Sequence, residues 1–346
     1  MRLMFHVSVD NYGITAGNKN KTIYLDPNKQ PNSGFVFISH AHTDHLYKSV
    51  KENGNKIITS KITHKIATHR GYKYGSTCEE HDFRLLDSGH ILGSNGLLIE
   101  DELYYTGDIS IRKRAFMNPA IVPRAKTLII ESTFGHPDYV FPKFESTIHK
   151  ANLIISEMYH QGIPVILLGY TLGKAQILTN VFRHWKPLIV HDSIDEMNRL
   201  YSEFGIRMDN YITLSEAEKN NILSSHKPWL LIAPIASCKN GFLHYIKKKY
   251  GALSIGFSGW AVKPYYKYAL GLDHCLPLSD HCDYNDLISV VKKCNPEKVY
   301  TFHGFAEGFA QNLRLIGFDA DPLVYFRSKK GKTSVKLDTF FGKSKS

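Results

Sequence analysis

The chain has 346 residues, and its 43% hydrophobic and 22% charged residues are ordinary for a soluble globular protein of one large or two intergrown domains. Its longest apolar runs are too short to span a bilayer, and Asp10 interrupts any signal-peptide core, so we expect a cytoplasmic protein without a membrane partner. The formal net charge of +11 suits a polyanionic partner such as nucleic acid, because a basic surface releases counterions when it binds a phosphate backbone. A basic protein with no special partner is an equally good interpretation of the composition.

The first part of the chain, up to Pro142, alternates short apolar runs with turn residues. This pattern predicts β-strands over residues 5–9, 22–25, 35–39 and 127–130, and a hairpin formed by 97–99 and 103–105. A helix is expected over residues 61–70. The sequence therefore predicts a β-rich sandwich with helices on the outside.

Beyond Pro142 the pattern changes to alternating helices and strands. Helical spacing covers residues 144–161, 172–184 and 193–203, and apolar runs at 164–168, 188–190 and 230–233 predict strands between them. This alternation is typical of parallel strands in a Rossmann-like insert. After Phe257 we expect a return to short strands and one helix, 284–294, and then a basic tail from Arg327. The predicted division is 1–142 for the first part of the core, 143–257 for the insert, and 258–346 for the second part with the tail.

The five cysteines form an odd, scattered set: Cys78, Cys238, Cys275, Cys282 and Cys294. None of them has C-x-x-C spacing. The pattern favours reduced, buried thiols over disulfides or a thiolate zinc site.

A histidine-rich segment follows directly on the predicted strand 35–39 and reads HAHTDH over residues 40–45. Side chains two apart on an extended chain share a face, so His40 and His42 can hold one ion together. Asp44 and His45 point elsewhere as the chain turns, which suits a second ion. Imidazole with carboxylate and no thiolate is a ligand set for catalytic zinc or a similar borderline metal, with one position left open for water.

Further ligand candidates follow in chain order. His90 precedes a turn of small residues that lets the backbone approach closely, and Asp108 follows a glycine at the end of a strand. Alone, each would be interpreted as an ordinary loop residue. Because the histidine-rich segment 40–45 precedes them, we interpret both as metal ligands. Asp26, which ends the strand 22–25, either anchors the metal loop from behind or is a plain turn carboxylate.

With these motifs in this order, the sequence resembles the metallo-β-lactamase superfamily. The resemblance implies an α/β fold built as an αββα sandwich, and a site for two Zn²⁺ ions, with Mn²⁺ as the alternative, in which Asp108 bridges the ions. The superfamily contains thioesterases, lactamases, oxygen reductases and nucleases, so the fold alone leaves the function open.

Three later segments narrow the resemblance to the β-CASP nucleases, whose motifs A, B and C they match. Glu131 closes a strand, His281 precedes a helix, and His303 ends another strand, while the α/β insert lies between the first two. The likeness implies that Glu131 orients His281, that His281 protonates the leaving oxygen, and that His303 completes the second metal's ligands. Phosphodiester hydrolysis by a two-metal-activated hydroxide, with Asp44 in the catalytic set, is then expected. A surface histidine before a helix is the competing interpretation of His281.

A glycine-containing turn opens the second helix of the insert and reads GYTLGKA over residues 169–175. It is not a Walker A loop, but it places Thr171, Gly173 and Lys174 at a helix N-terminus, where a phosphate can bind. An ordinary helix start is the alternative. Ser258 and Trp260 could likewise hold a phosphate or stack a base, and a packed tryptophan at a domain junction is an equally good interpretation.

The sequence offers features in favour of both DNA and RNA as the substrate. His303 at motif C resembles the RNA enzymes of the family, whereas the segments 169–176, 258–260 and 279–281 resemble prokaryotic DNA-ligase-associated exonucleases, which also have histidine at that position. We expect a DNA exonuclease acting in DNA repair on single-stranded substrate, with an RNA-processing nuclease of the messenger 3′-end type as the alternative. DNA-ligase or RNA-processing machinery would be the corresponding partner. A small-molecule metallohydrolase is the remoter alternative, and the oligomeric state stays open.

Overall fold

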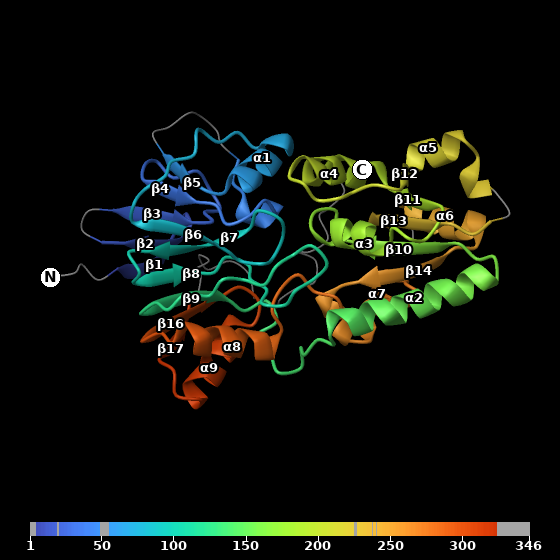
Figure 1. The fold of residues 1–346 in the computed structure, drawn as a ribbon. Coiled ribbons are helices and arrows are strands. Elements are labelled where there is room, and N and C mark those ends of the chain that lie inside the picture. Colours follow the sequence, from blue (N-terminus) through green and yellow to red (C-terminus); the bar gives the residue numbers. More distant parts are fainter. Residues whose placement is uncertain are drawn as a thin grey trace.

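The computed structural model describes residues 5–18, 21–48, 55–224, 227–236, 238–239 and 241–323. The predicted basic tail from Arg327 onwards lies outside these residues. The described strands form three sheets, which Figure 1 shows as two layers on one side of the molecule and a separate sheet on the other. None of the described helices is long and apolar enough to cross a membrane.

The first sheet has five strands in the order of the chain. They are β1 (His6–Asp10), β2 (Gly13–Gly17), β3 (Thr22–Leu25), β4 (Phe35–Phe37) and β5 (Lys56–Ile58). The first three strands are antiparallel, whereas β3, β4 and β5 run parallel to one another. Strand β3 shows the expected alternation, since Ile23 and Leu25 are buried, whereas Thr22 is exposed and Tyr24 is half-buried.

The second sheet has six strands in the order β17-β16-β9-β8-β7-β6. They are β6 (Phe83–Asp87), β7 (Asn95–Ile99), β8 (Leu103–Tyr105), β9 (Thr127–Glu131), β16 (Lys298–Phe302) and β17 (Ala320–Pro322). The β7–β8 hairpin turns at Glu100 and Asp101, whose φ angles are 48° and 56°. Two positive φ values are typical of the tight turns that match the twist of a hairpin.

These two sheets pack face to face. Ile23, Leu25 and Phe37 from the first sheet share a buried apolar cluster with Leu97 and Phe302 from the second. The outer face of the second sheet is covered by α8 (Tyr284–Cys294) and α9 (Ala306–Leu315), and α1 (Lys61–His69) covers the first sheet. The layers are therefore helix, sheet, sheet, helix, as Figure 1 shows.

Local sequence signals explain the ends of α8. The Asp283 carboxylate accepts a hydrogen bond from the Asp286 backbone N–H, and Asp286 bonds back to Asp283. This capping box satisfies backbone donors that a helix N-terminus leaves without partners. At the other end Asn295 takes a left-handed conformation, which stops the helix.

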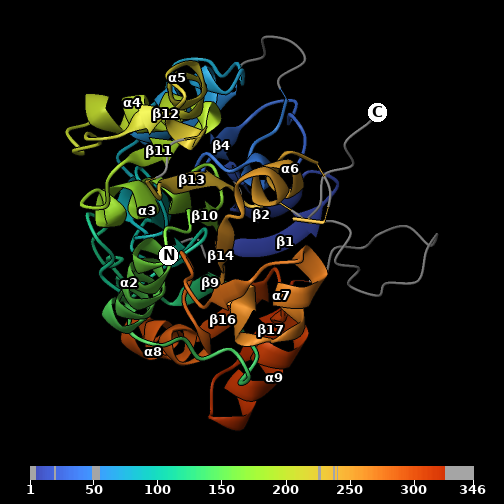
Figure 2. The ribbon, with the colours of Figure 1, turned by 90° about the vertical axis from the view of Figure 1, so that its right-hand side faces the viewer.

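The third sheet has the strand order β12-β11-β13-β10-β14-β15, and its paired strands all run parallel. Its strands are β10 (Val165–Gly169), β11 (Leu188–Val190), β12 (Ile212–Thr213), β13 (Leu230–Pro234), β14 (Leu253–Phe257) and β15 (His274–Leu276). One face packs on α2 (Phe144–His160), α3 (Lys174–Phe182) and α4 (Asp192–Glu203). The other packs on α5 (Leu214–Lys219), α6 (Gly241–Tyr250) and α7 (Tyr265–Leu270). Figure 2 shows α2 and α3 on one side of these strands and α6 and α7 on the other.

The predicted fold class, an αββα sandwich with an inserted Rossmann-like sheet, is confirmed. One detail differs beyond residue 257, where one helix was expected and α7, α8 and α9 are found. The short α7 is rich in tyrosine and has little helical signal, but α9 buries Phe309, Ala310 and Leu313 on one face, a spacing that the sequence displays. The division at 257 remains a prediction; β15 pairs with β14, so the third sheet continues as far as Leu276.

Apolar side chains join the insert to the sandwich. Leu172 and the α4 residues Leu200 and Tyr201 belong to the same buried cluster as Ala41 and Ile91 of the sandwich. Both sandwich residues neighbour candidate metal ligands. The insert therefore packs directly against the loops that form the site.

Candidate metal centre

The site lies where several strands end. Strands β8, β9 and β16 are parallel neighbours, so their carboxyl ends meet at one edge of the second sheet. Asp108 follows β8, Glu131 is the last residue of β9, and His303 follows β16. The loop after β4 in the facing sheet brings residues 40–45 to the same edge. Parallel topology thus gathers side chains that are far apart in sequence.

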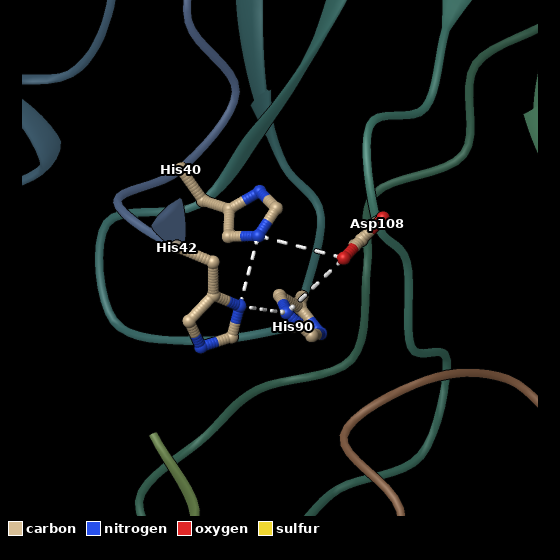
Figure 3. A group of neighbouring side chains, drawn as sticks. All are labelled: His40, His42, His90 and Asp108. Atoms are coloured by element: carbon tan, nitrogen blue, oxygen red, sulfur yellow. Dashed lines mark hydrogen bonds and ion pairs between the residues drawn. The ribbon is translucent and has the colours of Figure 1, made fainter. Parts of the chain in front are cut away.

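The first ligand cluster consists of His40, His42, His90 and Asp108, whose ligand atoms all lie within 4.8 Å of one another. His40 Nε2 lies 3.0 Å from His42 Nδ1, which lies 3.1 Å from His90 Nε2. Asp108 Oδ2 lies 3.4 Å from His40 Nε2 and 3.5 Å from His90 Nε2. Figure 3 shows these four side chains pointing toward one another.

The opposite nitrogens of these rings bind acceptors outside the cluster. His42 Nε2 donates to the Leu172 carbonyl at 3.2 Å, and His90 Nδ1 donates to the Asp280 carbonyl at 3.0 Å. A carbonyl can only accept, so each of these nitrogens carries the proton. The other nitrogen of each ring then presents its lone pair to the centre of the cluster, as a metal ligand must.

The second ligand cluster consists of His45, Asp108 and His303. His45 Nε2 lies 3.4 Å from Asp108 Oδ1, the carboxylate oxygen that faces away from the first cluster. Asp44 lies at the rim: its side chain is 72% exposed, and its Oδ2 is 3.8 Å from His45 Nε2. Asp108 thus stands between the two clusters, where the family resemblance implies a bridging ligand.

The donor set fits divalent metal ions. Within the described part of the chain, His45 Nε2 and Asp108 Oδ1 are buried and have no hydrogen-bond partner. Leaving such atoms unsatisfied costs about 1–3 kcal/mol each, and a bound cation would satisfy both. The 3.0–3.5 Å separations in the first cluster are also close to the roughly 3.3–3.6 Å edges of a tetrahedron with zinc–ligand bonds of about 2.0–2.2 Å.

The electrostatics of the cluster also suit a cation. Burial, together with the neighbouring imidazoles, lowers the pKa of His40 and His90 well below the usual value, so both rings are neutral and able to ligate. Burial also lowers the pKa of His45, but the carboxylates of Asp108 and Asp26 outweigh it and raise the pKa of His45 to about 10. The second cluster therefore attracts positive charge strongly.

Asp26 lies directly behind the metal loop. Its Oδ2 accepts from His45 Nδ1 at 2.9 Å, from the Ser39 hydroxyl at 2.6 Å and from the Tyr105 hydroxyl at 2.9 Å. Its Oδ1 accepts from the Ser39 backbone N–H at 2.7 Å. The Ser39 hydroxyl also lies 2.9 Å from His40 Nδ1, so one carboxylate orients a ring in each cluster.

Glu131 and His281 form a pair beside Asp108. His281 Nδ1 donates to Glu131 Oε1 at 2.8 Å, and His281 Nε2 lies 3.9 Å from Asp108 Oδ2. Burial opposes a charged ring, but the Glu131 and Asp108 carboxylates raise the pKa of His281 to about 9. Burial alone would raise the pKa of Glu131, but the attraction of His281 lowers it to about 2. His281 is therefore protonated and Glu131 ionised at neutral pH. Since Asp108, Glu131 and His281 also lie close enough to share an ion, metal analysis of a His281 variant is informative.

The predicted nucleic-acid-binding residues have mixed surroundings. Lys174 is buried and its ammonium lies 2.9 Å from Asp280 Oδ2, which does not fit direct contact with a phosphate. Gly173 is also buried, and Thr171 is half-buried. Ser258 is buried and caps the turn that holds Trp260, and Trp260 packs on Phe134 and Tyr139.

Several residues that support the site were not predicted from the sequence. Arg114 is buried and contacts the backbone of the His90 loop, but the sequence around it, RKR over residues 112–114, offers no way to separate it from its neighbours. Asp280 directly precedes the predicted site residue His281, and this position in the sequence is the signal by which it could have been found. Ser39 and Tyr105 read as ordinary strand residues.

An open pocket of about 600 Å³ adjoins the metal loop. It is lined by Asn28, Lys29, Gln30, Thr43, Leu46, Tyr47, Lys48 and Tyr72. Thr43 and Leu46 flank the ligand candidates Asp44 and His45, and the pocket's lysines are exposed.

Comparison with known proteins gives a consistent set of relatives. No family model matches the chain. The chain is 32% identical over 299 residues to a probable DNA ligase of Opitutus terrae, a match that covers 82% of this chain and 28% of that protein. It is 24% identical to an RNase J-like protein of Methanocaldococcus jannaschii, covering 87% of this chain and 80% of the relative. The chain thus spans about a quarter of the first relative's length.

Among solved structures, a protein of unknown function from Enterococcus faecalis has the same fold, with a TM-score of 0.61 and 14% identity over 93% of this chain and 97% of the other. The motif order, the sandwich with its parallel insert, and the sequence relatives agree with one another. These findings agree with the β-CASP family of the metallo-β-lactamase superfamily, which the sequence motifs resemble.

Proposed function

We propose that the chain is a metal-dependent nuclease that hydrolyses phosphodiester bonds, with DNA as the favoured substrate and RNA as the second candidate. The observation that carries the proposal is the Glu131–His281 pair, 2.8 Å apart, beside a buried cluster of histidines and Asp108. Cleavage of a phosphodiester expels an alkoxide, which needs a proton from a positioned acid. A metal cluster with a protonated histidine next to it has both of the parts that this reaction needs.

We assign two Zn²⁺ ions to the site, with Mn²⁺ as the alternative, because imidazole and carboxylate ligands accept either metal. His40, His42, His90 and Asp108 would hold the first ion, and His45, Asp108 and His303 the second, with Asp44 reaching in from the rim. Bound ions would supply Lewis acidity toward the phosphate and activate water.

His281 acts as the general acid in this proposal. Its Nδ1–H is held by Glu131, so Nε2 is the atom that delivers a proton to the leaving oxygen. The side chain is 22% exposed, which leaves it accessible to a bound substrate. Glu131 stays ionised and stabilises the charged imidazole, and the ring recovers its proton from solvent after cleavage.

The charge of the chain suits a nucleic-acid substrate. With a formal net charge of +11, the surface attracts a polyanion over long distances. The pocket beside Asp44 adds Lys29 and Lys48 at its lining, close to the more open of the two ligand clusters. We propose that a single strand passes over this pocket on its way to the metal centre.

DNA is the first candidate because the relative at 32% identity is named a probable DNA ligase. We propose an exonuclease that works in DNA repair in the cytoplasm, with ligase machinery as its partner. RNA is the second candidate, because the relative named RNase J-like aligns over 80% of its own length, the larger coverage of the two. RNA-processing machinery would then be the partner.

Matched single-stranded DNA and RNA oligonucleotides, labelled at the 5′ or the 3′ end and incubated with zinc or manganese, test the proposal. We expect stepwise shortening of DNA from one end, faster than that of RNA. Faster cleavage of RNA would favour the second candidate. Turnover of thioesters or a chromogenic lactam without cleavage of either polymer would contradict the proposed function.

A further inference from the structure

The turn that opens α3 is built around a buried lysine. Lys174 is 2% exposed, and its ammonium donates to the Leu278 carbonyl at 2.9 Å and lies 2.9 Å from Asp280 Oδ2. A phosphate-binding lysine has to present its ammonium to solvent or to a cleft. Here the ammonium is directed into the junction between the insert and the loop that carries His281.

Lys174 belongs to a set of three buried charges, which we call the ion triad: Arg114, Asp280 and Lys174. Arg114 Nη1 donates to Asp280 Oδ1 at 2.9 Å, so the single carboxylate is shared by two cations. All three residues are at most 5% exposed. Removing one partner from such a group leaves an uncompensated buried charge, which is strongly unfavourable. The three segments that carry these residues are therefore held in one arrangement.

The ion triad also contacts the backbone around the metal ligands. Arg114 donates to the carbonyls of Gly89, His90 and Ser279. The Asp280 carbonyl in turn accepts from His90 Nδ1 at 3.0 Å. The position and the ring orientation of His90 thus depend on two members of the ion triad.

The insert contributes a contact to a second ligand. The carbonyl of Leu172, two residues before Lys174, accepts from His42 Nε2 at 3.2 Å. Gly173 between them has a φ of +91°, and a Cβ at that position would lie 2.4 Å from Ile91 Cγ2. This turn is therefore pressed against the His90 loop with no room for a side chain, and Lys174 anchors it from the other side.

From these contacts we infer that Lys174, Asp280 and Arg114 are positioning residues, through which the insert fixes the ring orientations of His42 and His90 and so sets the metal affinity of the first ligand cluster. The inference rests on the proposed metal binding but not on the identity of the nucleic acid. It also reverses the expected role of Lys174, which supports the metal ligands and makes no contact with phosphate. Groups that orient metal-bound histidines typically change metal affinity 10- to 100-fold when they are removed.

Two measurements on the full chain separate the two roles of Lys174. The first is Zn²⁺ affinity, by competition with a chromophoric chelator. The second is the salt dependence of binding to a single-stranded oligonucleotide, measured without metal so that no cleavage occurs. For Lys174→Met we expect Zn²⁺ affinity to fall about 10- to 100-fold while the slope of log affinity against log salt stays unchanged. Lys219→Met, at the exposed end of α5, is the matched control and should change neither quantity.

The opposite result would overturn the inference. A lysine that contacts phosphate would lower the salt slope by about one when it is replaced, with Zn²⁺ affinity as in the wild type. If Lys174→Met does not fold, Asp280→Asn provides the same test with a side chain of nearly equal shape, and wild-type Zn²⁺ affinity in that folded variant would contradict the inference. Absence of Zn²⁺ binding by the wild type would instead contradict the proposed metal centre, so the two failures are distinguishable.

Discussion

The two ligand clusters that share Asp108 are built differently. In the first, His40 and His90 are at most 1% exposed, and backbone carbonyls from the insert and from the loop before His281 hold the rings of His42 and His90. In the second, Asp44 is 72% exposed, and His303 follows directly on a strand end. The rings of the first cluster are held by neighbouring carbonyls, whereas the second has an exposed carboxylate at its rim, and Thr43 next to that carboxylate lines the pocket with the exposed lysines.

From this difference we expect the first cluster to hold its ion tightly and the second to take part in the reaction. A cluster whose ligands are already oriented loses little conformational freedom when an ion binds, so we expect the first cluster to bind its ion more tightly. An open coordination position is what a reacting phosphate and water need, and the second cluster is the one near solvent. The largest effects should therefore come from Asp108, which serves both clusters.

We expect Asp108→Ala to reduce cleavage about 1000-fold or more and to lower the bound metal below one ion per chain. The reason is that both clusters lose a ligand, and bound metal ions stabilise the transition state of such a reaction by several kcal/mol. Cleavage rates and elemental analysis of the purified protein check this. Asp138→Ala, an exposed aspartate paired with Lys263, is the control and should behave as the wild type. Two bound ions in Asp108→Ala would show that the bridging assignment is wrong.

Replacing His281 with alanine separates acid catalysis from metal binding. We expect cleavage to slow by about 100- to 10,000-fold, because the leaving oxygen loses its proton donor, while the metal content stays at two ions. The measurement combines single-turnover cleavage with metal analysis. If the variant loses an ion, His281 is a ligand, as its closeness to Asp108 would allow.

A smaller effect is expected from Glu131→Gln, as a shift in pH dependence. The acid works only while protonated, so cleavage should fall as the pH rises through the pKa of His281. Burial lowers that pKa, but the Glu131 carboxylate raises it; without the carboxylate the fall should therefore occur at lower pH than in the wild type. Rates from pH 6 to 10 check this. An unchanged alkaline limb would contradict the pairing of Glu131 with His281.

The smallest effect should come from Lys48 in the open pocket. We expect Lys48→Ser to weaken binding of a single strand a few fold and to lower the salt slope by about one, with metal content unchanged. Binding titrations at several salt concentrations check this. A wild-type slope would mean that the strand does not pass over this pocket.

Local sequence patterns predicted much of the site because its ligands are close in sequence or follow strands. The segment 40–45 is a short-range signal. His90 was found because it precedes a turn of small residues, and Asp108 and His303 because each ends a predicted strand. Strand and helix periodicity likewise predicted the sandwich and the insert. These are features that depend on neighbouring residues.

Features that depend on tertiary packing could not be predicted. A lysine after a glycine at a helix start looks the same whether it faces solvent or a buried carboxylate, and only the fold brings Asp280, 106 residues later in the chain, to Lys174. Arg114 donates to the backbone carbonyl of His90, and Leu172 accepts from His42 through its own carbonyl. Contacts made by backbone carbonyls cannot be predicted from the pattern of side chains.

Titration of the metal-free protein with Zn²⁺, followed by calorimetry and by cleavage of a labelled strand, tests the two-cluster account most directly. We predict two binding events of different affinity, with cleavage appearing only as the weaker one fills, and loss of both the weaker event and cleavage in Asp44→Ala, whose carboxylate lies beside His45. A single binding event, or cleavage at the full rate with one ion per chain, would contradict the account.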